Sequence, residues 1–372
     1  MIDDLIYFKT RNTYYEGTFR DIFPTEEKVI ELNRAIIDPR RSLCMDENMF
    51  PTSTSFAEYI YCYNGDKLQW INNHSPTTNF KTGKELFLEN VELRKPIANE
   101  YVESLRNKQT VTLSDEFLYV NLLCIQRAYS FGHFLDFLLK LKNLPEKYLD
   151  QKICYIISDD NSVKEFGKWL TYMSPVKDFK TIKIYDFKDF QNKLLVFPRL
   201  LEIKKHIWYG NFSDKTDYDF IRNSIEQNIP FVGSQENKKL FLTRMPKQKR
   251  HIKNYEELHK KLTDRGIKIL YGDESLEEKY NLMNNSTHIC GYHGSMFINA
   301  LLFASPNTCI LEYCPETRYN CTLPVRSFGT EYYFFKTCPS DENHNTDLPI
   351  DEILSFYETD KDELKNSVKI IK

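Results

Sequence analysis

After residue 115, short continuous apolar runs alternate along the chain with segments whose apolar residues have helical spacing. Short apolar runs of the kind that form buried strands occupy residues 117–120, 152–157, 181–185, 193–197, 239–243, 267–271, 288–290 and 309–311. Segments with apolar residues at every third or fourth position predict helices at residues 133–141, 162–172, 217–227, 255–265, 275–283 and 296–304. This alternation predicts an α/β fold with parallel, doubly wound sheets and right-handed crossovers.

The two ends of the chain have weaker patterns. Residues 1–110 contain short aromatic and apolar runs, such as residues 56–63, which end at a hairpin-like Asn-Gly-Asp signal at residues 64–66. They predict a strand-leaning N-terminal extension, to which we assign no chemistry. Residues 350–371 predict one or two terminal helices, interrupted near residue 359.

A polar, turn-rich stretch at residues 233–237 separates two series of strands and helices. Such stretches are typical of interdomain linkers. We therefore expect an N-terminal domain at residues 1–232, a C-terminal domain at residues 233–345 and a C-terminal helical segment at residues 346–372.

Length, charge and cysteine usage narrow the class of protein. The chain has 372 residues and a net charge of −3, so no basic excess is present to neutralise the phosphates of a nucleic acid. No run of about 18 apolar residues predicts a transmembrane helix, and residues 1–10 are too acidic and too poor in apolar residues for a signal peptide. Nine cysteines without a CxxC pair are typical of buried, reduced thiols; metal binding by Cys309, Cys314 and Cys321 is the less favoured alternative. We expect a cytoplasmic protein.

A basic loop follows the predicted strand at residues 239–243 and is the first chemical candidate. Thr243 and Arg244 end the strand, and the loop then contains Lys247, Lys249, Arg250 and His251, before Asn254 at the N-cap position of the next helix. Arginine is well suited to bidentate contacts with phosphate. The alternative is a solvated basic loop, which composition alone favours.

The second candidate is the turn Gly291-Tyr292-His293-Gly294-Ser295, which joins a predicted strand to a predicted helix. The unpaired N–H groups and the dipole at the start of such a helix attract anions. Gly294 lets an anion approach the backbone, Ser295 can cap the helix, and His293 can reach a phosphate oxygen. On this stretch alone, an ordinary tight turn is the better interpretation.

Glu312, directly after the predicted strand at residues 309–311, is the third candidate. Its carboxylate can accept hydrogen bonds from two ribose hydroxyls, or it can form a surface salt bridge. All three candidates lie at carboxyl ends of predicted strands, where doubly wound folds bind ligands. The chain contains no GxxxxGK[ST], HExxH or GxSxG motif and no GxGxxG after a strand, which disfavours P-loop enzymes, nicotinamide dehydrogenases and hydrolases.

Taken together, Thr243-Arg244, residues 250–258 (RHIKNYEEL) and residues 291–303 (GYHGSMFINALLF) resemble glycosyltransferase family 61. In that family a Ser-Arg strand end is followed by Arg-Arg-x-x-Asn-x-x-Glu-Leu, by His-Gly-Ala-Gly-Leu-x-Asn-x-x-Phe, and by a strand that ends in Glu, here Glu312. Residues 129–141 are similar to the His-Trp-x-x-Asp segment of the family. The resemblance spans roughly residues 120–315, with the order and spacing of the motifs preserved.

The chain departs from the family pattern at four positions that bear on donor choice and turnover. Thr243 stands in place of Ser, His251 in place of the second Arg, Met296 in place of the second Gly, and Phe134 in place of Trp. The fold expectation is unaffected by these changes.

The resemblance implies a GT-B-like architecture, in which two Rossmann-like domains face a cleft. It also implies an inverting transfer of a sugar from a nucleotide-sugar donor, UDP-linked in our interpretation, to a hydroxyl of a glycan or glycoprotein. The donor-binding residues that it implies are Thr243, Arg244, Arg250, Asn254, His293, Gly294, Ser295 and Glu312. Because basic groups can replace a metal ion in stabilising the leaving diphosphate, we expect no metal and no other cofactor.

His133 and Asp136 are the catalytic pair that the resemblance implies. They are three residues apart and therefore share a helix face, so that one can act as the general base and the other can orient it. The alternative gives both residues structural roles. Two other functions remain open: a nucleotide- or glycan-binding protein without turnover, which His251 and Met296 favour, and a phosphotransfer enzyme, which the missing P-loop disfavours.

Overall fold

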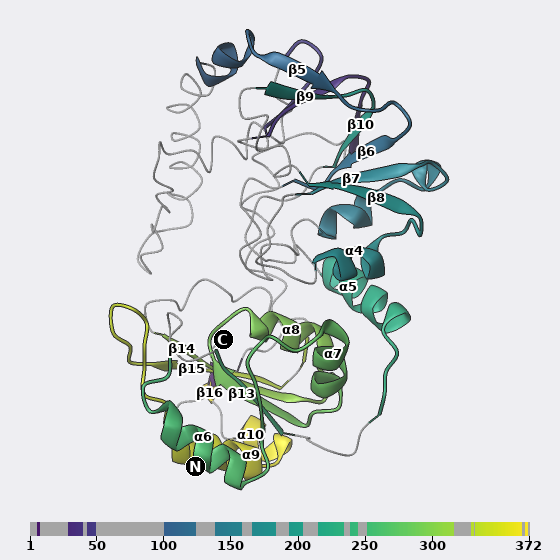
Figure 1. Ribbon diagram of the computed structural model, residues 1–372. Coiled ribbons are helices and arrows are strands. Elements are labelled where there is room, and N and C mark those ends of the chain that lie inside the picture. Colours follow the sequence, from purple (N-terminus) through teal and green to yellow (C-terminus); the bar gives the residue numbers. More distant parts are fainter. Residues whose placement is uncertain are drawn as a thin grey trace. The chain divides into compact units, whose positions relative to one another are not determined.

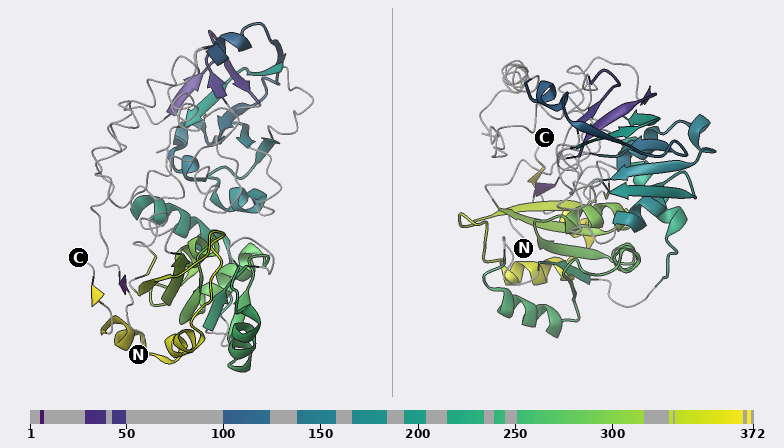
Figure 2. Two further views of the ribbon diagram at one scale, coloured as in Figure 1. Left: turned by 90° about the vertical axis from the view of Figure 1, so that its left-hand side faces the viewer. Right: turned by 45° about the horizontal axis from the view of Figure 1, so that its top comes forward.

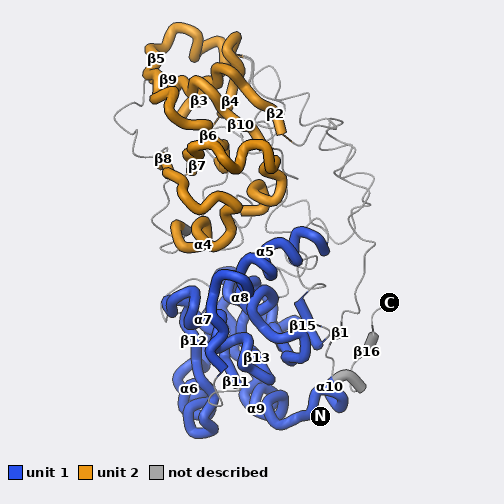
Figure 3. The backbone as a smooth tube through the Cα atoms, turned by 90° about the vertical axis from the view of Figure 1, so that its right-hand side faces the viewer, with its two compact units in different colours: residues 1–15, 210–372 blue, residues 16–209 orange. Residues whose placement is uncertain are grey.

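A computed structural model describes thirteen segments of the chain, which form two compact units (Figure 3). The segments are residues 6–7, 29–39, 43–49, 100–123, 138–157, 166–183, 193–203, 215–233, 239–244, 251–315, 329–330, 332–366 and 369–370. Residues 16–209 form the N-terminal unit, and residues 1–15 and 210–372 form the C-terminal unit.

The N-terminal unit contains two sheets. The first has the order β2-β10-β6-β7-β8 and consists of Val29–Leu32, Leu200–Ile203, Leu118–Asn121, Ile153–Ile157 and Phe179–Lys183. All of its pairings are parallel except that between β2 and β10. The second sheet has the order β4-β3-β9-β5 and consists of Leu43–Met45, Ala35–Asp38, Lys193–Phe197 and Gln109–Thr112.

Apolar runs explain the strands of the N-terminal unit. All five residues of β7, Ile-Cys-Tyr-Ile-Ile, are buried, as expected of a central parallel strand with both faces covered. The helices described in this unit are a helix at residues 100–105, α4 at Phe166–Met173 and the 3-10 helices η1 and η2 at Leu139–Asn143 and Glu146–Tyr148. In its described part, the expected helix at 133–141 passes from an α-helical residue, Leu138, into η1, and Pro145 prevents the chain from continuing as a regular helix beyond it.

One seven-stranded sheet organises the C-terminal unit, in the order β12-β11-β13-β14-β15-β1-β16. These strands are Lys268–Leu270, Lys239–Leu242, His288–Tyr292, Cys309–Pro315, Tyr333–Cys338, Ile6–Tyr7 and Lys369–Ile370. The pairings from β12 through β15 are parallel, and Figure 2 shows the green and yellow strands side by side in both views.

Helices cover both faces of this sheet (Figure 1). Helices α7 (Leu276–Asn284) and α8 (Met296–Phe303) lie on one face, together with α5 (Lys215–Asn228). Helices α6 (Tyr255–Asp264), α9 (Ile350–Glu358) and α10 (Lys361–Asn366) lie on the other face, where they share a core with β11, β13 and β14. The two α/β units confirm the expected fold class, and the facing arrangement of a GT-B fold stays a prediction.

The two compact units divide between residues 209 and 210, so α5 belongs to the C-terminal unit, whereas the sequence analysis places it in the N-terminal domain. The reason is the packing of α5 against the end of α8. Tyr218 donates a hydrogen bond to the carbonyl of Leu301 at 3.2 Å, and Nη1 of Arg222 donates to the carbonyls of Leu302 and Ala304, each at 2.7 Å. These partners are distant in sequence, so composition gave no sign of them.

The expected helical segment at residues 346–372 forms α9 and α10, but it is not a separate unit. Ile353 and Phe356 of α9 are fully buried in the core of the C-terminal unit. In the N-terminal extension, β5 is a described strand, whereas residues 56–66 fall outside the described residues.

Candidate functional site

The carboxyl ends of β11 and β13 approach each other closely at Gly291. A Cβ atom at this position would lie 2.2 Å from the carbonyl oxygen of Leu242, so no larger residue fits without a backbone shift. Thr243 follows Leu242 and is buried, and its N–H donates a hydrogen bond to the carbonyl of Leu270 on β12 at 2.9 Å. Thr243 therefore continues the sheet, and Arg244 is the first residue beyond it.

Arg244 lies against the turn after β13. A Cβ atom on Gly294 would be 3.0 Å from Nη2 and 3.2 Å from Nε of Arg244. The glycine therefore leaves the space that the guanidinium occupies. Two candidates from separate parts of the sequence, the Thr-Arg strand end and the His-Gly turn, thus meet at one edge of the sheet.

Ser295 occupies the N-cap position of α8 but does not cap it with its side chain, contrary to expectation. Its φ and ψ angles, −60° and −21°, are helical, and the first turn is tightened by a hydrogen bond from the N–H of Phe297 to the carbonyl of Gly294 at 3.0 Å. A capping side chain needs an extended N-cap backbone, so the hydroxyl cannot reach back to the helix.

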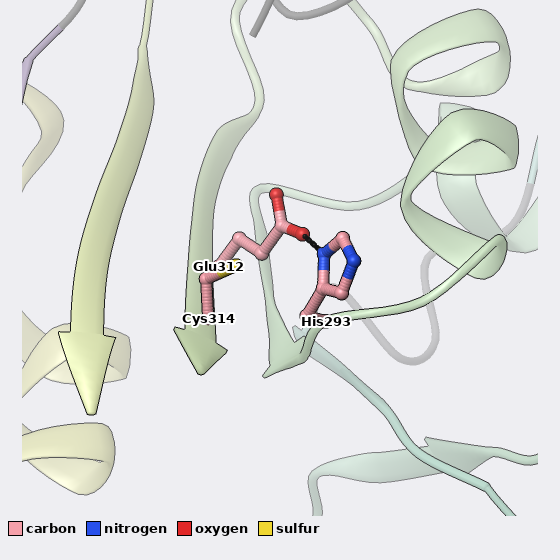
Figure 4. A group of neighbouring side chains, drawn as sticks. All are labelled: His293, Glu312 and Cys314. Atoms are coloured by element: carbon pink, nitrogen blue, oxygen red, sulfur yellow. Dashed lines mark hydrogen bonds and ion pairs between the residues drawn. The ribbon is translucent and has the colours of Figure 1, made fainter. Parts of the chain in front are cut away.

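His293 and Glu312 form a buried hydrogen-bonded pair. Nδ1 of His293 lies 2.5 Å from Oε1 of Glu312, and the two side chains are 6% and 1% exposed (Figure 4). The hydroxyl of Tyr333, on β15, donates to the other carboxylate oxygen of Glu312. Both oxygens of Glu312 are hydrogen-bonded within the sheet, and the expected contact of this carboxylate with ribose hydroxyls stays a prediction.

Asn254 has a structural role in the C-terminal unit, and its expected role in binding the donor stays a prediction. Its side chain donates a hydrogen bond to the carbonyl of Leu348 at 2.8 Å and accepts one from the N–H of Leu348 at 3.0 Å, so it joins α6 to the segment before α9. No cap bond is made by this side chain, although Asn254 is the N-cap residue of α6. Asn254 thus holds the end of the basic loop in place.

Residues 131–311 match the family described as Glycosyltransferase 61. This match assigns residues 131–311 to glycosyltransferase family 61. The matched region contains the Arg244–Gly294 contact and His293, whereas Glu312 lies one residue beyond its end. The protein is therefore a glycosyltransferase, and the resemblance carried by its motifs is confirmed. Among curated proteins, no significant match to the sequence was found.

Two solved structures to which this glycosyltransferase is similar are heptosyltransferases. One is E. coli heptosyltransferase WaaC with ADP, with 11% sequence identity and a TM-score of 0.38 over 65% of this chain and 99% of that chain. The other is the dodecameric iron-containing heptosyltransferase TibC in complex with ADP-D-beta-D-heptose, with 10% identity and a TM-score of 0.30 over 69% of this chain and 76% of that chain.

Three buried side chains of the glycosyltransferase form a group that could hold a metal ion. The ligand atoms of His293, Glu312 and Cys314 lie within 4.8 Å of one another. However, Nδ1 of His293 and Oε1 of Glu312 are 2.5 Å apart, which is a hydrogen-bond distance. A zinc ion needs about 2.0–2.2 Å to each of these atoms, at angles that keep them further apart. The donor geometry therefore favours a shared proton over an ion.

Met296, which replaces a family glycine, extends from the start of α8 to the end of β12. Its Sδ lies 3.2 Å from the position of a Cβ on Gly272, whose positive φ of 92° suits glycine. Nδ2 of Asn299 contacts the same sulfur at 3.7 Å, whereas its buried Oδ1 has no hydrogen-bond partner. The bulky fourth residue of the turn thus packs against Gly272, just after β12.

Three predicted site residues, His133, Asp136 and Arg250, lie outside the described residues, so their roles stay predictions. Tyr333 is a site residue that the sequence did not suggest. It lies on β15, which pairs with β14 in parallel, and only this pairing brings its hydroxyl to Glu312. No described helix is both long enough and apolar enough to span a membrane.

Proposed function

We propose that this glycosyltransferase transfers a sugar from a nucleotide-sugar donor, UDP-linked, to a hydroxyl of a glycan or glycoprotein, with inversion at the anomeric carbon. The observation that carries the proposal is the contact of the Arg244 guanidinium with Gly294, beside His293. It gathers cationic groups at the carboxyl edge of a parallel sheet, where nucleotide ligands bind in doubly wound folds.

The first step of the argument concerns the diphosphate of the donor. Arg244 offers several N–H donors in one plane, which suits a phosphate. The first turn of α8 adds the positive end of a helix dipole, and Gly294 has no side chain to block an anion. Arg250, by its family motif, is the second arginine of this site.

The second step concerns catalysis. Negative charge grows on the nucleoside diphosphate as the glycosidic bond breaks, and preorganised cations stabilise it without a metal ion. We therefore propose metal-independent transfer. An acceptor hydroxyl that attacks the anomeric carbon directly needs a general base, and we assign this role to the pair His133 and Asp136 on the strength of the family motif.

A catalytically inactive nucleotide- or glycan-binding protein is the second candidate function. The observation that favours it is Met296, a bulky residue at the fourth position of the turn, where the family pattern has glycine. Donor binding without sugar transfer would be its signature.

Thermal unfolding with a panel of nucleoside diphosphates and nucleotide sugars tests the proposal. A ligand that binds only the folded protein stabilises it by about 2.7 kcal/mol at a hundredfold excess over its Kd. We expect UDP and UDP-sugars to raise the Tm of the wild type. Removal of a charged hydrogen bond costs about 1.5–3 kcal/mol, so Arg244→Ala should weaken binding about 10- to 150-fold.

Arg265→Ala is the matched control, because this arginine lies in the same unit but forms a surface pair with Glu358. It should respond to UDP as the wild type does. No Tm shift with any nucleotide at millimolar concentration would contradict the proposal. Product analysis by NMR then separates the two candidates: a glycoside of inverted anomeric configuration supports transfer, and binding without product supports the inactive protein.

A further inference from the structure

The imidazole of His293 is fixed from the interior of the sheet. Glu312 holds Nδ1, and Tyr333 holds Glu312, so residues from β14 and β15 support a residue at the end of β13. Figure 4 shows the second ring nitrogen of His293 on the side of the ring away from Glu312. Of these three residues, the proposed function involves only His293. It gives no role to Glu312 or Tyr333.

We infer that Glu312 and Tyr333 are positioning residues that keep His293 oriented and positively charged, so that a buried imidazolium assists Arg244 in binding the diphosphate of the donor. This inference rests on the proposed function, and it makes donor binding dependent on pH. It gives Glu312 a role through His293 in place of a contact with the ribose.

The charge balance of the buried group supports this inference. Glu312 is 1% exposed, and the burial of an unpaired carboxylate is strongly unfavourable. A protonated His293 cancels that charge across a 2.5 Å contact. A neutral His293 would leave a net negative charge directly beneath the proposed diphosphate site, where it would repel the ligand.

The other described groups around His293 act in opposing directions. Arg244 lies beside Gly294 and disfavours a second positive charge. Tyr333 donates a hydrogen bond that stabilises the carboxylate form of Glu312, and the buried thiol of Cys314 lies on the same strand. A bound diphosphate adds negative charge and favours the imidazolium, so donor and proton should bind cooperatively.

The geometry also fixes which atom serves the ligand. An imidazolium donates from both nitrogens. With Nδ1–H directed at Glu312, Nε2–H is the donor on the opposite side of the ring that we assign to a phosphate oxygen, and the ring cannot turn without breaking the buried pair. Tyr333 limits the rotation of the carboxylate in the same way.

Measurement of UDP affinity between pH 5.5 and 9 tests the inference on wild type, Glu312→Gln and Tyr333→Phe. We expect Glu312→Gln to bind UDP within about threefold of the wild type at pH 5.5. As the pH rises, the variant should begin to lose UDP affinity about one pH unit below the wild type. On the alkaline side, the variant should therefore bind UDP about tenfold more weakly than the wild type. Tyr333→Phe should show a smaller shift in the same direction.

Glu352→Gln is the matched control, because Glu352 also accepts hydrogen bonds from a tyrosine, Tyr313 at 2.6 Å, and from a cation, Lys336 at 2.7 Å. It should leave the pH profile of binding unchanged. A profile of Glu312→Gln that coincides with that of the wild type would overturn the inference. So would a stoichiometric metal ion in the purified wild type that is lost in Glu312→Gln.

Nitrogen-15 NMR of histidine side chains in the wild type keeps the test decisive if the variants do not fold. We expect His293, identified by its absence in His293→Gln, to be doubly protonated at pH 7.5, and a neutral ring at that pH overturns the inference. The two hypotheses fail differently. No UDP binding at any pH rejects the proposed function, whereas pH-independent binding with a neutral His293 rejects only the role of Glu312 and Tyr333.

Discussion

The guanidinium of Arg244 occupies the space that a side chain at Gly294 would need, 3.0 Å from the position of the missing Cβ. This contact joins the end of β11 to the start of α8. It explains why an arginine and a glycine from separate motifs belong to one site, and it gives the site a direct test.

Alanine at Gly294 should mainly weaken UDP binding, whereas alanine at Gly291 should mainly lower the stability of the fold. The methyl group of Gly294→Ala would contact the flexible end of the Arg244 side chain, so we expect little loss of stability. The affinity for UDP should fall about 3- to 10-fold, which corresponds to a loss of about 1 kcal/mol of binding free energy. Gly291→Ala meets the backbone of Leu242 at 2.2 Å, so overpacking should cost about 1–3 kcal/mol or more of unfolding free energy. Urea unfolding and isothermal titration measure the two effects.

A double-mutant cycle sharpens this prediction. If Gly294→Ala acts by displacing Arg244, it should weaken UDP binding much less in the Arg244→Ala background. Additive losses in the double variant would contradict the proposed mechanism.

Arg222 should stabilise the C-terminal unit far more than another charged residue of the same helix. It donates to the carbonyls of Leu302 and Ala304 at the end of α8. Arg222→Met leaves both carbonyls without this donor, and we expect a loss of about 2–4 kcal/mol, since charged hydrogen bonds contribute about 1.5–3 kcal/mol each. Lys215 is also on α5 and forms a surface pair with Asp219. The substitution Lys215→Met should lower the free energy of unfolding by less than about 0.5 kcal/mol. Equal losses in denaturant unfolding would argue against the docking of α5 on α8.

The Asn254 side chain should contribute to stability through its two bonds to Leu348. Asn254→Ala removes both bonds, and we expect a loss of about 1–3 kcal/mol of unfolding free energy. Asn307→Ala, at an exposed loop position, is the control and should lie within about 0.5 kcal/mol of the wild type. If Asn254→Ala unfolds like the wild type but no longer binds UDP, the result contradicts the structural role and supports donor binding by Asn254.

We expect the ionisation of Asp341 to make the free energy of unfolding depend on pH in the acid range. Hydrogen bonds from Asn345, with help from Lys253 and the N–H of Asn343, lower the pKa of Asp341 from 3.8 to about 2. Because the folded-state pKa is depressed, the ionised group stabilises the fold fully above the unfolded pKa, and this contribution is lost as the pH falls through about 2.

Asp341→Asn retains an acceptor oxygen but carries no charge, so it isolates this effect. The difference in stability between wild type and Asp341→Asn should be constant above about pH 5 and should shrink between about pH 4 and pH 2. Urea unfolding at a series of pH values measures it. A difference that stays constant down to pH 2 would show that the charge of Asp341 does not contribute.

The sequence by itself determined the α/β class and most of the strands. Apolar runs such as residues 153–157 and 309–311 are buried in parallel sheets and have no other stable location, so local pattern was sufficient. The strand-turn-helix-strand unit from residue 287 to residue 312 was also correct in outline, because glycine and proline mark its turns.

Tertiary structure alone decided what the polar residues do. Glu312 reads as a free carboxylate in the sequence, but the parallel pairing of β13, β14 and β15 places it between His293 and Tyr333. Asn254 reads as a helix cap, and α5 reads as the end of the first domain, but their partners lie distant in sequence. Hydrophobic period is a local property of the chain, whereas the partner of a buried polar group is set by sheet register and helix packing.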